Sequence, residues 1–395
     1  MSRPGRRWIH RLAAVILMAA FCLRPVALAA AVPLPPVNDA PRHVLCDGLS
    51  DQAKAYYAGD HAYDRLAALD GAGETTDGYA AMRDNPLFDA LHALMADTHL
   101  AYTAYSGYNA GSLAYYWAAT DAVNSGDTYV MFYSDVPADS PDAKLNREHI
   151  WPKSRASYNE KNGGADLHHL RPALDYLNRD KSDHAFGNVR GTYAEGVKAG
   201  LVNGEEAYWV CAKADRFECK DDVKGDVARI LLYVYCRWEQ PNLYTDMTDH
   251  LPAMDADDKS NSGLRAVEDL DTLLQWCAID PVDEWEMTRN DRIERVQGNR
   301  NVFIDYPELA WRLFERDVPA DMPTPSGDWI RGDINMSGAV SAEDALMALQ
   351  VSTGKIRFTP AQSGLGDVDG SQTVTAADAL VILQLATGKI DRFFA

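Results

Sequence analysis

One stretch of the chain, from Asn146 to Asn188, concentrates the side chains that can perform hydrolytic chemistry. It holds four of the ten histidines, mixed with carboxylates, arginines and amides: His149, His168, His169, His184, Glu148, Asp166, Asp175, Arg147, Arg155, Arg171, Asn178 and Asn188. A histidine titrates near neutrality, so it can act as a general base, and carboxylate and amide oxygens suit Mg²⁺. The composition of this stretch therefore predicts one metal ion beside a general base.

Hydrolysis of a phosphodiester requires a nucleophilic water, relief of charge on the phosphorane and help for the leaving oxygen. Glu148 and Asn178 offer oxygen ligands for a metal ion, and His149 is the candidate base. Neighbouring residues on a straight strand point to opposite faces, so we expect a twist or bulge where Glu148 meets His149.

The elements that must position these groups can be read from the same stretch. We expect a strand over 147–151, a turn at Gly163–Gly164, a second strand over 166–171 and a helix after Pro172. On the second strand, alternation would place Asp166 and His168 on one face, with His169 and Arg171 on the other.

Two alternatives accompany the histidines and arginines of this stretch. His168 and His169 could bind zinc, but adjacent residues of one strand cannot both reach one metal. Arg147, Arg155 and Arg171 are either phosphate clamps or solvated charges, and Arg171 is favoured as a clamp because it lies beside the histidines.

Composition and charge bound the function class. The chain has 395 residues, 47% of them hydrophobic, which is sufficient for two or three globular domains. Its net charge of −20 argues against passive adsorption to nucleic acid. Residues 144–190 nevertheless carry nine Lys or Arg against six Asp or Glu. A basic island in an acidic protein fits an anionic substrate that is gripped locally.

The amino terminus resembles an export signal. Four arginines precede an apolar run over 12–23, and Ala27-Leu28-Ala29 offers a cleavage site; an uncleaved anchor is the alternative. Export permits disulfides, and five cysteines follow the signal: Cys46, Cys211, Cys219, Cys236 and Cys277. Cys211 and Cys219 are close enough to staple a loop, and the other pairings cannot be ranked. None of these cysteines shows a CxxC spacing, which argues against a zinc–thiolate site.

Outside the central stretch the pattern is mostly helical. Helices are expected through 46–133, and a central core helix is expected at 224–238. The segment 271–314 is expected to form a helix, a turn at Asp280–Pro281, a second helix, a loop and a last helix. The loop 297–303 is rich in amides and arginine, which suits either phosphate or structural hydrogen bonding. His61, His92 and His99 are expected to be ordinary surface or core histidines.

Six ordered motifs carry a family resemblance: NREHIWPKS, ADLHHLRP, the asparagine of YLN, FGNV, FECKDDVKGDVARILLY, and LLQW followed by DPVDEWEMTRNDRI and QGNRNVFIDYPELA. Together they resemble the bacterial endonuclease I family over about 46–314. The resemblance implies a secreted, sequence-nonspecific nuclease of mixed α+β, mostly helical fold with a ββα-metal core. It also implies His149 as general base, Glu148 and Asn178 as ligands of one Mg²⁺ or Mn²⁺, and products with 5′-phosphates. His168 and His169 would orient the base and the scissile phosphate.

One departure from that family concerns the residues that follow the metal-binding asparagine. The family commonly has a triplet like Arg-Ser-Asn, whereas this chain has Lys181-Ser182-Asp183. The departure bears on a supporting phosphate or hydrogen-bond contact and leaves the metal ligand itself intact.

An internal repeat ends the chain: GDINMSGAVSAEDALMALQVSTGKI over 332–356 recurs as GDVDGSQTVTAADALVILQLATGKI over 366–390. Its alternating oxygen-bearing residues resemble the calcium loops of a type I dockerin, which implies two Ca²⁺, a cohesin partner on a scaffold and an all-α module. The implied ligands are Asp333, Asn335, Ser337, Ala339, Ser341 and Asp344, then Asp367, Asp369, Ser371, Thr373, Thr375 and Asp378. The alternative is an EF-hand-like pair without a partner.

The expected organisation is a signal peptide over 1–30, a leader over 31–45, a nuclease domain over 46–316, a Pro-rich linker over 317–330 and a dockerin over 331–395. The expected function is an exported endonuclease for DNA, with RNA as a further substrate. A dockerin-bearing polysaccharide hydrolase and a catalytically dead scaffold-attached module are the rival hypotheses. A glycosidase would need a pair of carboxylates in a sugar cleft, and Glu148 has no evident partner.

Overall fold

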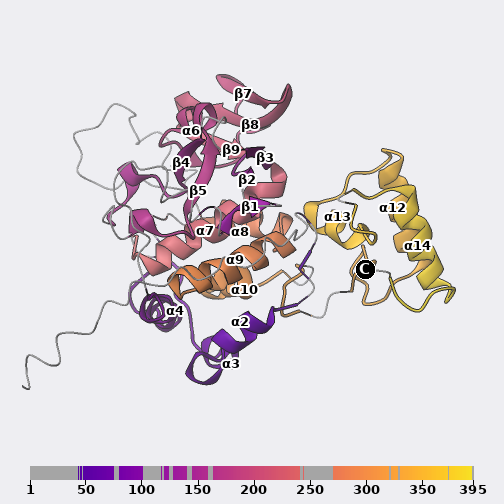
Figure 1. The fold of residues 1–395 in the computed structure, drawn as a ribbon, viewed down its shortest axis with the longest axis horizontal. Helices are drawn as coiled ribbons and strands as arrows, with labels where there is room; N and C mark the ends of the chain where they lie inside the picture. The colour runs from indigo at the N-terminus through magenta and orange to yellow at the C-terminus, as the bar shows by residue number, and fades with distance from the viewer. Residues whose placement is uncertain are drawn as a thin grey trace, which may run out of the picture. The chain divides into compact units, whose positions relative to one another are not determined.

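The computed structural model describes residues 43, 45–46, 48–74, 80–100, 117, 120–123, 128–139, 145–158, 163–240, 243, 270–319, 322–327, 330–371 and 373–393. The expected signal peptide lies outside these residues, as does most of the leader. Helices and sheets both contribute, so the prediction of a mixed fold is confirmed (Figure 1). Among the described helices, none is long and apolar enough to cross a membrane.

Helices open the described chain, as expected, with α2 (Asp51–Tyr56), α3 (Tyr63–Ala67) and α4 (Pro86–Asp97). The side chain of Asn85 caps α4 by accepting from the backbone N–H of Phe88, and proline occupies its first turn. The expectation of helix through Tyr133 is wrong, because β1 (Ala122–Val123), β2 (Thr128–Met131) and β3 (Val136–Asp139) form an antiparallel sheet there. β-Branched and aromatic residues over 128–130 favour that strand.

The centre of the core is α7 (Lys224–Arg237), which the sequence predicted almost to the residue. Its side chains are buried nearly all round, against α4 on one side and α8 (Leu270–Ile279) on another. Its charged Arg229 is buried as well and pairs with Glu286 of the helix Glu284–Gln297, so α7 lies inside the domain on its charged side too. In Figure 1, α7, α8 and α9 lie below the strands.

The predicted helix, turn and helix arrangement over 271–314 is confirmed. After α8 come α9 (Glu284–Gln297), α10 (Val302–Asp305) and α11 (Leu309–Arg312). Asp283 caps α9 by accepting from Glu286 N–H, and Gly298, with φ of 89°, ends it in a left-handed turn.

The hairpin and helix of the central stretch are β4 (Leu145–His149), β5 (Leu170–Leu174) and α6 (Asp175–Lys181). The two strands pair antiparallel from Leu145↔Leu174 to His149↔Leu170 without a register shift, so the expected bulge is absent. The second strand was expected over 166–171 but begins at Leu170. Asp166 instead closes a turn, because its backbone oxygen accepts from the N–H groups of His169 and Leu170.

Pro172 lies inside β5, so the expectation of a helix directly after it is displaced to Asp175. A sheet of two strands has only edge strands, and proline is tolerated on an edge. The order strand, strand, helix is nevertheless the expected one.

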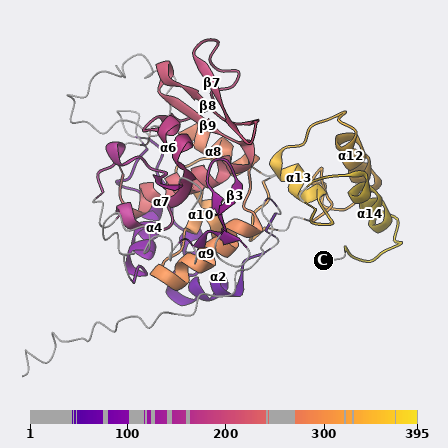
Figure 2. The same cartoon turned by 45° about the horizontal axis from the view of Figure 1, so that its top comes forward.

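A four-stranded sheet follows that the sequence did not indicate, in the order β6 (Ala185–Phe186), β9 (Arg216–Cys219), β8 (Glu205–Cys211) and β7 (Val197–Val202). Figure 2 shows β7 and β8 as a hairpin that extends from the sheet. The register pairs Cys211 with Arg216 and Cys219 with Tyr208. The two cysteines therefore lie at opposite ends of the paired segment, too far apart for a disulfide.

The expected Cys211–Cys219 bridge is wrong for that reason. All five described cysteines are buried thiols: Cys46, Cys211, Cys219, Cys236 and Cys277. Burial raises the pKa of the thiols of Cys219 and Cys236 well above the ordinary value and that of Cys277 to about 12. These thiols behave as small apolar side chains of the core.

The carboxyl-terminal module contains α12 (Ala342–Ser352), α13 (Pro360–Gly366) and α14 (Ala376–Ala386). α12 packs against α14, and both begin with a capping box, made by Ser341 with Asp344 and by Thr375 with Asp378. The module has its own small core of Ile334, Ala345, Ala348, Val368, Ala379 and Ile382. This is the all-α arrangement that the repeat predicted.

Candidate active site

An open cleft of about 460 Å³ lies where β4 meets the carboxyl-terminal end of α6. Its lining residues are Asn146, Arg147, Glu148, His149, Pro152, Lys153, Ser154, Asn178, Ser182 and Asp183. The structure thus brings the predicted base and both predicted metal ligands to one cleft. Glu148 and His149 both line it without a bulge, and β4 ends at His149.

Glu148 enters the cleft from β4 and is almost completely buried. Its Oε1 accepts a hydrogen bond of 2.7 Å from the hydroxyl of Tyr133 and lies 3.8 Å from the ammonium of Lys181. Burial raises the pKa of Glu148 to about 7, although Lys181 and Tyr133 act to lower it. The Tyr133 bond fixes one carboxylate oxygen and leaves Oε2 as the oxygen for a ligand.

His149 is the last residue of β4, and its Nε2 lies 2.8 Å from the carbonyl oxygen of Gly164. A carbonyl only accepts, so Nε2 carries the proton in the neutral ring and Nδ1 carries the lone pair. Burial lowers the pKa of His149 well below its ordinary value, and the neighbouring ring of His169 lowers it further. The imidazole is therefore neutral at neutral pH, as a general base must be before it accepts a proton.

Asn178 faces the cleft from α6 and is half-buried. Its Nδ2 donates to the backbone oxygen of Arg147 over 3.2 Å, so the amide nitrogen is turned toward β4. That bond leaves Oδ1 as the ligand atom. A carboxylate oxygen and an amide oxygen are hard donors, and the donor set of this cleft therefore fits Mg²⁺ or Mn²⁺.

His168 and His169 do not line the cleft and are fully buried beneath it. His169 Nε2 bonds the carbonyl of Gly163 at 2.5 Å, and its ring meets that of His149 edge to face with centroids 5.6 Å apart. His168 Nε2 lies 3.2 Å from the carbonyl oxygen of Asn299. His169 therefore contacts the candidate base directly, whereas His168 anchors the turn to the loop after α9.

Asp166 organises the buried network around these histidines. Its carboxylate accepts from the Tyr233 hydroxyl at 2.7 Å and from Gln297 Nε2 at 2.8 Å. The amide-rich loop 297–303 is thus structural. Arg300 within it is fully buried and pairs with Asp305 at 2.6 Å, so the phosphate-binding alternative for this loop is not what the structure shows.

The three arginines take different positions. Arg147 lines the cleft. Arg171 is the register partner of Glu148 across the hairpin but is buried outside the cleft, where its Nε donates to Asp121 at 2.9 Å and its guanidinium lies 4.2 Å from the ring of Phe132. Arg155 is fully buried and pairs with Asp215. The structure therefore does not bring Arg155 or Arg171 to the cleft with Glu148 and His149.

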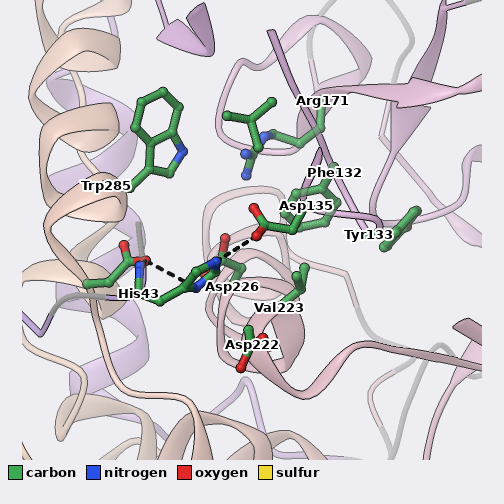
Figure 3. Close-up of a pocket in the computed structure, with 11 residues that line it drawn as sticks. His43, Phe132, Tyr133, Asp135, Arg171, Asp222, Val223, Asp226 and Trp285 are labelled. Carbon is green, nitrogen blue, oxygen red and sulfur yellow. Dashed lines mark hydrogen bonds and ion pairs between the residues drawn. The ribbon is translucent and has the colours of Figure 1, made fainter. Parts of the chain in front are cut away.

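Figure 3 shows the small cavity into which Arg171 points. His43, which precedes α2, closes one side of it: Nε2 lies 2.6 Å from Asp135 Oδ2, and its backbone N–H donates to Asp283 over 2.7 Å. Burial by itself would lower the pKa of His43, but the bond to Asp135 and the charges of Asp135 and Asp283 raise it to about 9. This clasp fastens the amino-terminal segment to the turn before β3 and to the start of α9.

Sequence reasoning missed several residues of the site. Tyr133 supports Glu148 from outside the central stretch, and no motif or spacing points to it. Lys181 departs from the family triplet, but nothing in the sequence predicts its fully buried ammonium beside Glu148. Lys153 and Ser154 follow the first strand closely and could have been found from their position next to Pro152.

The two loops of the carboxyl-terminal module have the same local geometry. In the first, Asp333 accepts from the backbone N–H groups of Ser337 and Gly338, and Asp344 accepts from those of Asn335 and Ser341. In the second, Asp367 accepts from Ser371 N–H, and Asp378 accepts from those of Val368, Asp369 and Thr375. Acidic first and twelfth residues therefore converge in each loop.

One oxygen from each of Asp367, Asp369 and Asp378 lies within 4.8 Å of the others. The hydroxyl of Ser371 donates to the carbonyl of Thr373 at 3.1 Å, and that of Ser337 to the carbonyl of Ala339 at 3.3 Å. The backbone carbonyls of Thr373 and Ala339, expected as calcium ligands, thus lie next to the serine hydroxyls that are also expected as ligands. Hard oxygens in this arrangement suit Ca²⁺.

Comparison with known proteins identifies relatives of the central domain. A family model described as Endonuclease I matches residues 92–308. An extracellular ribonuclease of Bacillus subtilis (strain 168) is 38% identical over 168 residues, which cover 42% of this chain and 52% of the relative. An extracellular ribonuclease of Bacillus amyloliquefaciens is 33% identical over 217 residues, 52% of this chain and 69% of the relative.

More distant relatives are also nucleases by name. A periplasmic deoxyribonuclease of Aeromonas hydrophila is 28% identical over 152 residues, 38% of this chain and 50% of the relative. The chain thus spans about half the length of the first and third of these relatives. These matches support the prediction of a nuclease hydrolase and disfavour the polysaccharide hydrolase. The matched residues include the whole cleft.

Proposed function

Because this chain belongs to the endonuclease I family, we propose that it is a secreted, sequence-nonspecific endonuclease that hydrolyses the phosphodiester bonds of RNA and DNA. The observation that carries the proposal is the meeting of Glu148, His149 and Asn178 in one open cleft. RNA joins DNA as a substrate because the two Bacillus relatives are named ribonucleases. Export is supported by the arginine-rich, apolar amino terminus and by the extracellular relatives.

His149 acts as the general base in this proposal. The Gly164 carbonyl holds the proton on Nε2, so Nδ1 takes a proton from the attacking water. His169 keeps the ring in place through its edge-to-face contact and its own bond to Gly163. The strand end and the Gly163–Gly164 turn thus set both the tautomer and the direction of the base.

Glu148 and Asn178 would hold one Mg²⁺ or Mn²⁺ through Oε2 and Oδ1. When bound, the ion relieves charge on the scissile phosphate and assists the departing 3′-oxygen, which leaves the 5′-phosphate on the other product. Tyr133 and the Arg147 carbonyl orient the two ligands through the atoms that face away from the ion. Arg147 and Lys153 are the basic residues that line the cleft, where the phosphates would lie.

The test uses the full chain with supercoiled plasmid and with single-stranded RNA, each with Mg²⁺, with Mn²⁺, with Ca²⁺ alone and with EDTA. We expect cleavage that requires Mg²⁺ or Mn²⁺ and that falls by roughly 10²–10⁴-fold in His149→Ala, the range that a general base contributes. The control is His61→Ala, which removes an imidazole outside the cleft. Full activity in His149→Ala would refute the assignment of the base. A folded wild-type protein without cleavage under any of these conditions would refute the nuclease.

For the carboxyl-terminal module we propose a dockerin that binds two Ca²⁺ and attaches the enzyme to a cohesin domain of a scaffold. The paired loop geometry supports calcium. The partner is supported by four exposed leucines at equivalent positions of the two repeats: Leu346 and Leu349 on α12, Leu380 and Leu383 on α14, 40–56% exposed. Exposed apolar patches commonly mark protein–protein interaction sites.

This second proposal is tested by calorimetry with Ca²⁺ and by binding to an immobilised type I cohesin. Two Ca²⁺ per chain are expected, and Asp344→Ala with Asp378→Ala should remove both. Leu346→Asp with Leu380→Asp should abolish cohesin binding and retain the calcium. Binding of neither ligand by folded protein would refute this assignment without affecting the nuclease.

A further inference from the structure

Three side chains outside the cleft hold one of its walls in place. We infer that Arg155, Asp215 and His184, the brace, are positioning residues that fix the turn after α6 and thereby the metal ligand Asn178. This inference rests on the proposed function, since the role of Asn178 belongs to it. None of the three lines the cleft, so their effect on catalysis is transmitted through other residues.

Arg155 joins two segments whose residues line the cleft. It ends the short helix η2 (Lys153–Arg155), whose other residues line one wall. Its Nε donates to the backbone oxygen of Asp183, which lines the cleft from the turn after α6, and its Nη2 pairs with Asp215. The side chain is fully buried. A buried guanidinium with two fixed partners cannot reorient to grip a phosphate, but it can hold η2 against the turn after α6.

Asp215 brings the four-stranded sheet into this arrangement. It lies in a left-handed turn, with φ of 54°, between β8 and β9. One carboxylate oxygen pairs with Arg155, and the other lies 2.8 Å from His184 Nδ1. Its backbone oxygen accepts from Ala185 N–H over 3.1 Å. The turn after α6 is therefore held from the sheet as well as from η2.

The turn that the brace holds is strained. Ser182 caps the end of α6 with φ of 48° and ψ of −129°, a conformation that glycine adopts readily and serine does not. A strained residue persists only where its surroundings impose the conformation. Ser182 N–H donates to the carbonyl oxygen of Asn178 over 2.8 Å. Relaxation of Ser182 therefore breaks the last turn of the helix that presents Asn178.

A second contact acts in the same direction. The hydroxyl of Ser154 donates to Asp183 Oδ2 over 2.9 Å, and this bond also joins η2 to the turn after α6. It is exposed, so it contributes less than the buried guanidinium. Arg155 is thus the main link, and its removal should loosen Asn178 without removing any group that faces the substrate.

The experiment compares the wild-type full chain with Arg155→Met. Mn²⁺ binding is measured by calorimetry on protein saturated with Ca²⁺, and Glu148→Gln serves as the blank. Hydrogen exchange is measured for the segment 175–184. The kinetic constants kcat and KM are measured on RNA. We expect Mn²⁺ affinity to fall roughly 10- to 100-fold, as it does when supporting residues of metal sites are removed. Exchange in α6 should accelerate, and kcat should fall while KM changes less.

A second substitution separates this role from general stabilisation. Ser182→Gly allows the turn its conformation without strain, so Arg155→Met with Ser182→Gly should recover Mn²⁺ affinity and kcat relative to Arg155→Met. The matched control is Arg190→Met, which removes an arginine that pairs with Glu218 of β9 and with Asp221, and none of these three residues belongs to the brace. It should lower stability and leave the Mn²⁺ affinity unchanged.

The outcomes distinguish the two proposals. Wild-type protein that neither binds Mn²⁺ in the cleft nor cleaves would refute the proposed function. If the wild type is active, two results would refute the brace alone. In the first, Arg155→Met has an unchanged Mn²⁺ affinity. In the second, Arg155→Met folds, but adding Ser182→Gly does not improve its Mn²⁺ affinity or kcat. If Arg155→Met does not fold, Asp215→Asn is used with the same readouts and the same Ser182→Gly partner, and the same criteria decide.

Discussion

The His43 clasp makes the stability of this protein depend on pH in a direction that can be worked out from the structure. His43 bonds Asp135 at 2.6 Å and has Asp283 Oδ2 3.8 Å from Nδ1. Its pKa is about 9 in the folded chain against 6.5 in the unfolded chain. A raised pKa means that the folded state binds the proton more tightly, so protonation stabilises the fold. This stability is complete below pH 6.5 and is lost as pH rises through about 9.

The magnitude follows from linkage, which gives about 1.4 kcal/mol for each pH unit between the two pKa values. The charged form of His43 contributes about 3 kcal/mol at pH 6, about 1.4 kcal/mol at pH 8 and nearly nothing at pH 10. His43→Gln removes the titrating charge and keeps a side chain that can bond Asp135. The free energy of unfolding should therefore differ between wild type and variant by about 3 kcal/mol more at pH 6 than at pH 10.

Urea unfolding followed by tryptophan fluorescence at pH 6, 8 and 10 measures this difference. Other groups also titrate in this range, but their effects cancel when the variant is subtracted from wild type at each pH. His61→Gln, outside the clasp, is the control, and Asp135→Asn should reduce the same pH dependence because it removes the partner. A difference between wild type and His43→Gln that stays constant from pH 6 to 10 would show that the ring is not protonated in the fold.

Two further predictions concern the core. Asp121→Ala should destabilise the fold by about 3–5 kcal/mol in thermal or urea unfolding. Arg171 and Arg289 both pair with this buried carboxylate, so its removal would leave two buried charges uncompensated. A loss of stability below about 1 kcal/mol would contradict the pairing. Native protein should show no reaction of its five described cysteines with a thiol reagent and no change of melting temperature with reductant, because all five are buried thiols. Loss of a disulfide on reduction, together with a lower melting temperature, would contradict the prediction that these cysteines are thiols.

The site could be predicted largely because its groups are close in sequence. Glu148 and His149 are adjacent, and Asn178 lies on the first helix after the hairpin. Short local motifs specify such a unit, since one turn brings the strands together. The boundaries were less well predicted: Asp166 directs its carboxylate to Tyr233 and Gln297, far away in sequence, and so forms a turn instead of continuing the strand.

The four-stranded sheet and the support for Glu148 could not be predicted in the same way. β7 is exposed and has glycine at position 200, so its alternation is weak. Its place in the sheet depends on pairing with β8, and β6 joins only through a parallel pairing with β9. Tyr133 reaches Glu148 from a position shortly after a strand of another sheet. Non-local pairings of this kind have no local pattern, because tertiary contacts decide them.

The basic island shows most clearly what composition conceals. Residues 144–190 hold more cations than anions, yet several of those cations never reach the surface. Arg171 is neutralised by Asp121 and Arg155 by Asp215, carboxylates that lie outside the segment, while Lys181 is buried beside Glu148. The excess charge of the segment is therefore largely internal. It fastens the hairpin and α6 to their surroundings, and the charge offered to a polyanion in the cleft reduces to the few basic residues that line it.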